Sequence, residues 1–79
     1  MHLVVYSLDK TLFEGEVEKL IAKTAMGEIT VLDNHIPLVS ILTNSPLSIV
    51  DKSSKKNTID VGSGIIEIRP ESQVVILAN

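Results

Sequence analysis

The sequence offers few side chains that could carry out covalent chemistry. It contains no cysteine, and its only imidazoles are those of His2 and His35. Nucleophilic catalysis requires a hydroxyl or thiol beside an oriented base, and no such arrangement can be recognised. The two histidines are too far apart in sequence to indicate a metal site. Carboxylates at every second position are typical of a solvated strand face, and this fits Glu14, Glu16 and Glu18 better than an acid/base pair does. We therefore expect a non-catalytic protein without metal or cofactor.

Length and charge narrow the function classes further. The 79 residues suffice for one domain, which we place at 1–79. The formal net charge of −3 argues against nucleic acid as a partner, because phosphate binding depends on clustered lysine and arginine. No apolar run approaches the roughly 18 residues of a membrane span, and no signal peptide is recognisable. We expect a soluble, cytoplasmic protein that reaches a membrane only through a partner.

The stretch 27–42 predicts two strands around a polar corner. Ile29 and Val31 alternate with Glu28, Thr30 and Leu32, which is the period of a pleated strand. The polar residues 33–35 then interrupt the apolar run, and Asp and Asn there tolerate turn conformations. Pro37 fixes its own φ and extends the residue before it, so the corner should be stiff. A second strand begins at residue 38.

His35 in this corner has two interpretations. Sequence alone favours a turn histidine that bonds nearby backbone. The alternative is a contact residue at a rigid tip, with Glu28, Asp33 and Asn34 beside it.

Other segments also predict short strands. Residues 9–23 are ambiguous, because Phe13, Val17 and Leu20 fit one face of a helix, whereas Gly15 would cost a helix about 1 kcal/mol. The alternative there is two short strands broken at Gly15. Strands spaced at about 8–12 residues indicate an all-β sandwich or barrel. The expected strands are 2–8, a hairpin of 47–50 with 58–61, then 65–69 and 73–78.

Three motifs resemble the epsilon subunit of rotary F-type ATP synthases. The family pattern Gly-Glu-Leu-Gly-Ile-x-Pro-Gly-His-Ala-Pro-Leu is similar to 27–38. Residues 61–68 resemble its Ser-Gly-Gly-x-x-Glu-Val, and 13–17 resemble its Phe-x-Gly-x-Val. The three follow the family's order and spacing. The matched residues of the first motif are Gly27, Glu28, His35, Pro37 and Leu38.

This resemblance implies a fold and a function. The fold is the family's amino-terminal domain, an all-β sandwich of two antiparallel sheets with about ten short strands, which favours strands at 9–23. The function is that of a non-catalytic central-stalk subunit, which binds the gamma subunit through the sandwich and helps couple proton flow to ATP synthesis. It would sit peripherally on the cytoplasmic face of a bacterial plasma membrane. The implied c-ring contacts are Glu28, Asp33, Asn34 and His35, and the expected turn and bend positions are Gly27, Pro37, Gly62 and Gly64.

The sequence departs from the family pattern at three places. Thr30 replaces a glycine, which questions close backbone packing there. Asp33-Asn34 replaces Pro-Gly; asparagine suits a left-handed turn position, but the aspartate adds a charge at the implied contact. The family usually continues into a carboxy-terminal helical hairpin that restrains ATP hydrolysis and in some members binds ATP. We expect a chain ending at Asn79 to do neither.

Two other functions stay open at this stage. Lipoyl-type carrier domains are also small, acidic and all-β, with a modified lysine at a hairpin tip. Asp51-Lys52-Ser53 is loosely similar to their Asp-Lys-Ala, although 39–50 lacks the upstream glycine of that pattern. The other alternative is a β-sandwich adaptor without a rotary role.

Overall fold

The computed structural model describes residues 1–79 and consists of eight β-strands without a helix. The all-β prediction is confirmed, and the helical alternative for 9–23 is wrong. No segment forms a helix of the length and apolarity needed to cross a bilayer. The strands are β1 (His2–Tyr6), β2 (Thr11–Thr24), β3 (Gly27–Val31), β4 (Leu38–Leu42), β5 (Leu47–Asp51), β6 (Lys56–Ile59), β7 (Gly64–Arg69) and β8 (Gln73–Ala78).

The chain has eight strands instead of about ten because β2 is continuous. The sequence predicts a break at Gly15, yet Gly15 pairs with Leu3 inside the ladder. β2 changes partners along its length: its first half pairs with β1, and its second half lies between β3 and β5. A bulge between Val17 and Lys19 lets the strand bend from one layer into the other. Pairing with β1 therefore outweighs the weak intrinsic tendency of glycine to form a strand.

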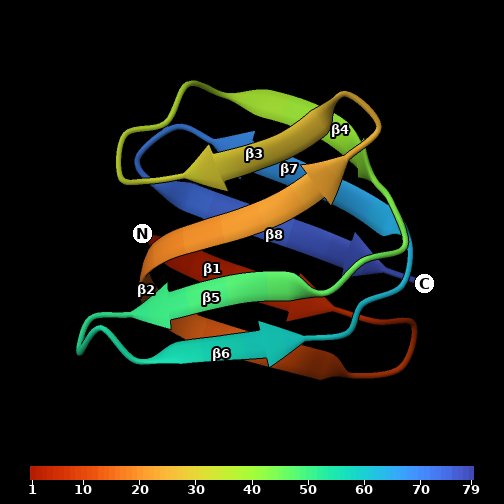
Figure 1. Cartoon of the computed structure of the whole chain (residues 1–79), viewed down its shortest axis with the longest axis horizontal. Coiled ribbons are helices and arrows are strands. Elements are labelled where there is room, and N and C mark those ends of the chain that lie inside the picture. Colours follow the sequence, from red (N-terminus) through yellow and green to blue (C-terminus); the bar gives the residue numbers. More distant parts are fainter.

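The strands form two layers joined through β2. The pairing order is β1-β8-β7-β4-β2-β5-β6, with β3 added to β2. β1 also pairs with β2, so five strands close on themselves. In Figure 1, β3, the second half of β2, β5 and β6 form the near layer, and β4, β7, β8 and β1 lie behind it. β1 pairs antiparallel with β2 and parallel with β8.

One hydrophobic core fills the space between the layers. Sixteen buried residues, mostly valine, leucine and isoleucine, belong to it. Leu3, which could have faced outward, is fully buried in this core. The one buried polar residue is Thr24, whose hydroxyl donates to the Gly27 carbonyl at 2.9 Å and accepts from the Met26 amide at 3.1 Å. No buried side-chain polar atom lacks a partner, which avoids the penalty of an unmade hydrogen bond.

Candidate functional site

The predicted corner is present between β3 and β4. Asn34 adopts φ 64°, the left-handed conformation anticipated for it. The His35 amide donates to the Leu32 carbonyl at 3.2 Å and closes the turn. The ring Nδ1 of His35 donates to the Ile36 carbonyl at 2.7 Å, because a carbonyl can only accept. His35 is half-buried and bonds nearby backbone, as the simpler interpretation predicts, and its Nε2 forms no hydrogen bond within the chain.

The side chains before His35 are engaged within the chain. The carboxylate Oδ1 of Asp33 lies 2.6 Å from the α-ammonium of Met1, which also donates to the Val17 carbonyl. The second oxygen, Oδ2, lies 4.0 Å from the Lys52 ammonium. The backbone amide of Asn34 donates to the Ser72 hydroxyl at 2.9 Å. The turn is therefore tied to three distant segments of the chain.

These contacts border a polar hollow of about 450 Å³. Charged groups of both signs line this hollow. No three His, Asp or Glu side chains in the structure are close enough together to hold a metal ion. The hollow joins the start of β1 to the turns that end β3, β5 and β7. Its lining residues include Met1, His2, Glu16, Asp33, Lys52 and Glu71.

The ion pair perturbs the titration of Asp33. The hydrogen bond from the α-ammonium of Met1, and then its charge, hold the pKa of Asp33 below its ordinary value of 3.8. A carboxyl group whose pKa is lower in the folded state stabilises the fold above the unfolded-state pKa. That contribution is lost as the pH falls through the folded-state pKa.

Asp33→Asn should consequently remove a pH-dependent part of the stability. At neutral pH we expect the variant to unfold at lower urea concentration than the parent chain. The difference should vanish once the pH is below the folded-state pKa of Asp33, because the parent carboxyl group is then also neutral. Urea unfolding of both chains from about pH 7 to about pH 2 measures this. Asp60→Asn, at an exposed site without an ion pair, is the control, and an equal pH profile for both variants would contradict the assignment.

Glu28 lies away from this turn. It sits at the other end of β3, opposite Lys23 of β2 and next to Gly27, whose φ is 116°. Asp33 follows Glu28 by five positions, which extended chain spans in about 16 Å. Glu28 instead borders a second hollow with residues of β2, β5 and β6. The structure therefore brings Asp33, Asn34 and His35 together and places Glu28 elsewhere.

The expected bend at 62–64 is present between β6 and β7. Gly62 adopts φ 63°, which favours glycine. Gly64 begins β7, and a Cβ there would lie 2.1 Å from the Leu77 carbonyl oxygen. Pro37 directly precedes β4, in the position expected for it.

The structure shows a row of exposed apolar side chains that the sequence did not predict. It crosses four strands of one layer in register: Ile41 of β4 pairs with Ile65 of β7, which pairs with Leu77 of β8, which pairs with Tyr6 of β1. These four side chains are between 41% and 63% exposed. We call them the apolar row. Contiguous exposed apolar side chains often mark docking sites, so the apolar row is a candidate for one.

Comparison with known proteins identifies a family over the whole chain. The family model described as ATP synthase, Delta/Epsilon chain, beta-sandwich domain matches residues 1–79. The chain is 38% identical over 78 residues to the ATP synthase epsilon chain of Halalkalibacterium halodurans and 36% identical to that of Exiguobacterium sp.. In both cases 99% of this chain and 57% of the relative are covered. The chain thus spans little more than half the length of these relatives.

Solved structures confirm the fold. A chain in the mitochondrial ATP synthase of Euglena gracilis superposes with a TM-score of 0.90 at 23% identity, over 96% of this chain and 48% of that one. A chain from the central stalk and c-ring of the Tetrahymena thermophila mitochondrial ATP synthase gives a TM-score of 0.79 at 19% identity, over 99% and 62%. At these identities the likeness concerns the fold alone.

Proposed function

Because the chain belongs to the β-sandwich domain family of the ATP synthase delta/epsilon chain, we propose that it is a non-catalytic part of the central stalk of an ATP synthase. In this role it links the gamma subunit to the c-ring and helps couple proton flow to ATP synthesis. It would lie on the cytoplasmic face of a bacterial plasma membrane and be held there through the complex. The function is mechanical, since the chain would transmit torque without making or breaking a covalent bond.

The apolar row is the observation that carries this proposal. Tyr6, Ile41, Ile65 and Leu77 form one continuous stripe, and Val39 lies exposed beside it on β4. Burying the rest of each of these side chains against a partner would contribute roughly 1 kcal/mol. The gamma subunit is the partner that we assign to this layer. The assignment leaves the opposite layer, with β3, free to meet other partners.

The c-ring contact would run along β3. Glu28 and His35 stand near the two ends of this strand, and β3 pairs only with β2, so its other edge is free. We propose that β3 lies along the polar loops of the ring, so that its ends meet loops of different c subunits. Asp33 and Asn34 would border this contact while their intramolecular bonds hold the turn in shape.

The fold suits the transmission of force. Five strands close on themselves, and one core is shared by both layers. Closed sheets have few free edges and cannot easily open by sliding of one layer. A load applied at β3 would therefore pass through the whole body to the apolar row.

The structure gives little support to the alternative of a lipoyl-type carrier. Lys52 does lie in the turn between β5 and β6, as that alternative requires. Its ammonium lies 4.0 Å from Asp33 Oδ2, within the polar hollow. Family membership over residues 1–79 favours the stalk function over this carrier and over an adaptor without a rotary role.

Removing both ends of the proposed ring contact should weaken coupling without unfolding the domain. Glu28→Ala combined with His35→Ala removes two side chains outside the core, so the unfolding transition should hardly move. Proton-driven ATP synthesis in vesicles reconstituted with the complex should fall below the parent level, and each single variant should have a smaller effect. ATP synthesis by vesicles prepared without this chain gives the lower limit for the comparison. Unchanged synthesis by the double variant would contradict the ring contact, and full synthesis without the chain would contradict the stalk function.

A further inference from the structure

The layer opposite the apolar row carries most of the positive charge. Lys19, Lys23 and Lys56 project from its outer surface, and Lys55 stands in the adjoining turn. These are four of the seven cationic side chains of a chain whose net charge is −3. We call the outward side of β2, β3, β5 and β6 the lysine face. In register across it lie Lys19, Ile21, Lys23, Glu28, Thr30, Ser48, Val50, Lys56 and Thr58.

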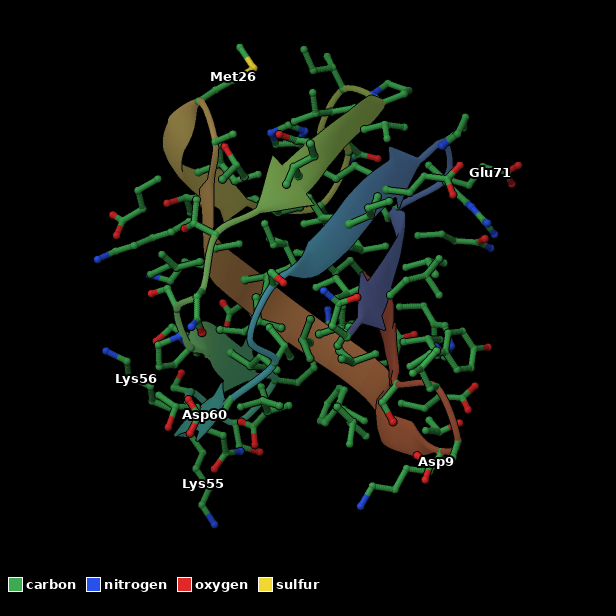
Figure 2. All side chains as sticks on the ribbon, turned by 90° about the vertical axis from the view of Figure 1, so that its right-hand side faces the viewer. Asp9, Met26, Lys55, Lys56, Asp60 and Glu71 are labelled. Atoms are coloured by element: carbon green, nitrogen blue, oxygen red, sulfur yellow. The ribbon has the colours of Figure 1, made fainter.

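The lysines of this face have no partner within the chain. Lys52 is the only lysine that forms an ion pair, and it does so with Asp33 in the polar hollow. Figure 2 shows Lys55 and Lys56 projecting away from the sandwich at the start of β6, whereas Asp60 follows the other end of this strand. Two glutamates share the face, Glu18 at the bulge and Glu28 on β3, and neither forms an ion pair. The face therefore keeps an excess of unpaired ammonium groups in a protein that is acidic elsewhere.

A hollow of about 330 Å³ lies on the face between two of these lysines. Lys23 and Lys56 border it together with the hydroxyl groups of Ser45, Ser48 and Thr58. Ammonium and hydroxyl groups are the donors that a carboxylate accepts from, and such charge-assisted hydrogen bonds are stronger than neutral ones. Glu28 on one side favours an acidic group held by a flexible partner chain over a small polyanion.

We propose that the lysine face binds an acidic segment of a partner protein, with one of its carboxylate side chains seated in this hollow. The proposal goes beyond the stalk function: it concerns the outer surface of this layer, whereas the proposed ring contact runs along the free edge of β3, and the two share Glu28. Complementary charge is what selects this occupant. Half-buried Ile21 and Val50 lie between the lysines and would contact the aliphatic parts of the segment.

Other anionic partners fit the face less well. Proteins that bind nucleic acid add arginine and aromatic side chains, which hydrogen-bond and stack, to the phosphate contacts of lysine, and Arg69, Tyr6 and Phe13 all lie outside this face. An anionic bilayer is a large surface that would repel the acidic remainder of a body of net charge −3, and the exposed apolar side chains nearby, Leu32 and Met26, lie at opposite ends of β3 and form no continuous patch on the face.

A short fluorescein-labelled peptide of alternating glutamate and serine is the probe for this proposal. The chain should bind it saturably at low salt, more weakly as salt is raised, and amide resonances of ¹⁵N-labelled protein should shift around Lys23, Ser48 and Thr58. Lys23→Glu with Lys56→Glu should weaken binding at least about tenfold. The control, Lys10→Glu with Arg69→Glu, makes the same change in net charge away from the face and should weaken it less than about threefold.

Three results would overturn the proposal. The first is equal loss of binding in the two double variants, and the second is resonance shifts outside the lysine face. The third is binding to phosphatidylglycerol vesicles without saturable binding to the peptide, which would assign the face to a membrane. None of these results bears on whether the chain supports ATP synthesis, so failure here leaves the stalk function to its own test.

Discussion

Gly64→Ala is expected to destabilise the fold by about 3 kcal/mol or more. The added Cβ would lie 2.1 Å from the carbonyl oxygen of Leu77 and 3.1 Å from the Cα of Ala78. Both neighbours are backbone atoms of β8, so no side chain can rotate away to make room. The start of β7 would have to separate from β8, with loss of ladder hydrogen bonds between the two strands.

Urea unfolding of the variant measures this effect, and Gly15→Ala is the matched control. Gly15 also lies within a strand and has no positive φ. A Cβ there meets only the Phe13 ring, at 3.7 Å, which is ordinary van der Waals contact. We expect the control to change the free energy of unfolding by less than about 1 kcal/mol. Equal destabilisation by both substitutions would show that strand propensity, and not the close approach of β8, requires glycine at position 64.

Ile65→Asp is expected to weaken docking of the gamma subunit strongly while leaving the domain folded. Ile65 stands in the middle of the apolar row, between Ile41 and Leu77, and is 46% exposed. In the free chain the new carboxylate would be hydrated. In the complex it would be buried without a partner, which costs about 3 kcal/mol and weakens binding roughly 100-fold.

Co-purification of gamma with a tagged chain tests this expectation, and titration of purified gamma gives the change in affinity. Thr30→Asp adds the same charge to the exposed surface of the other layer and should leave gamma binding within about threefold of the parent chain. The urea midpoint of each variant shows whether the fold survives. Retention of gamma by a folded Ile65→Asp chain would remove the apolar row from the proposed interface.

Local pattern was enough to predict the type of structure. The strand over 28–31 and the turn chemistry of Asn34 appear where the sequence indicates them. The β5–β6 hairpin is also present, but its second strand, expected at 58–61, lies two residues earlier, at Lys56–Ile59. These features depend on neighbouring residues and on the intrinsic preferences of strands and turns. The break expected at Gly15 is absent, since β1 and β5 hold β2 together from outside its own sequence.

The arrangement of the candidate site could not be obtained in the same way. The partner of Asp33 is the α-ammonium of Met1, 32 residues earlier in the chain. The apolar row takes one residue from each of four strands, so no window of sequence contains it. The separation of Glu28 from His35 could have been anticipated, because a strand of this length holds its two ends apart.

The parallel pairing of β1 with β8 constrains how the chain reaches its native state. His2 is opposite Gln73, so the first strand gains its second neighbour only when the last has been synthesised. Contacts between residues so distant in sequence close a long loop and slow folding. On the ribosome, the emerging polypeptide would hold an incomplete barrel with one edge of β1 unpaired. Its native topology becomes accessible only after β8 leaves the exit tunnel.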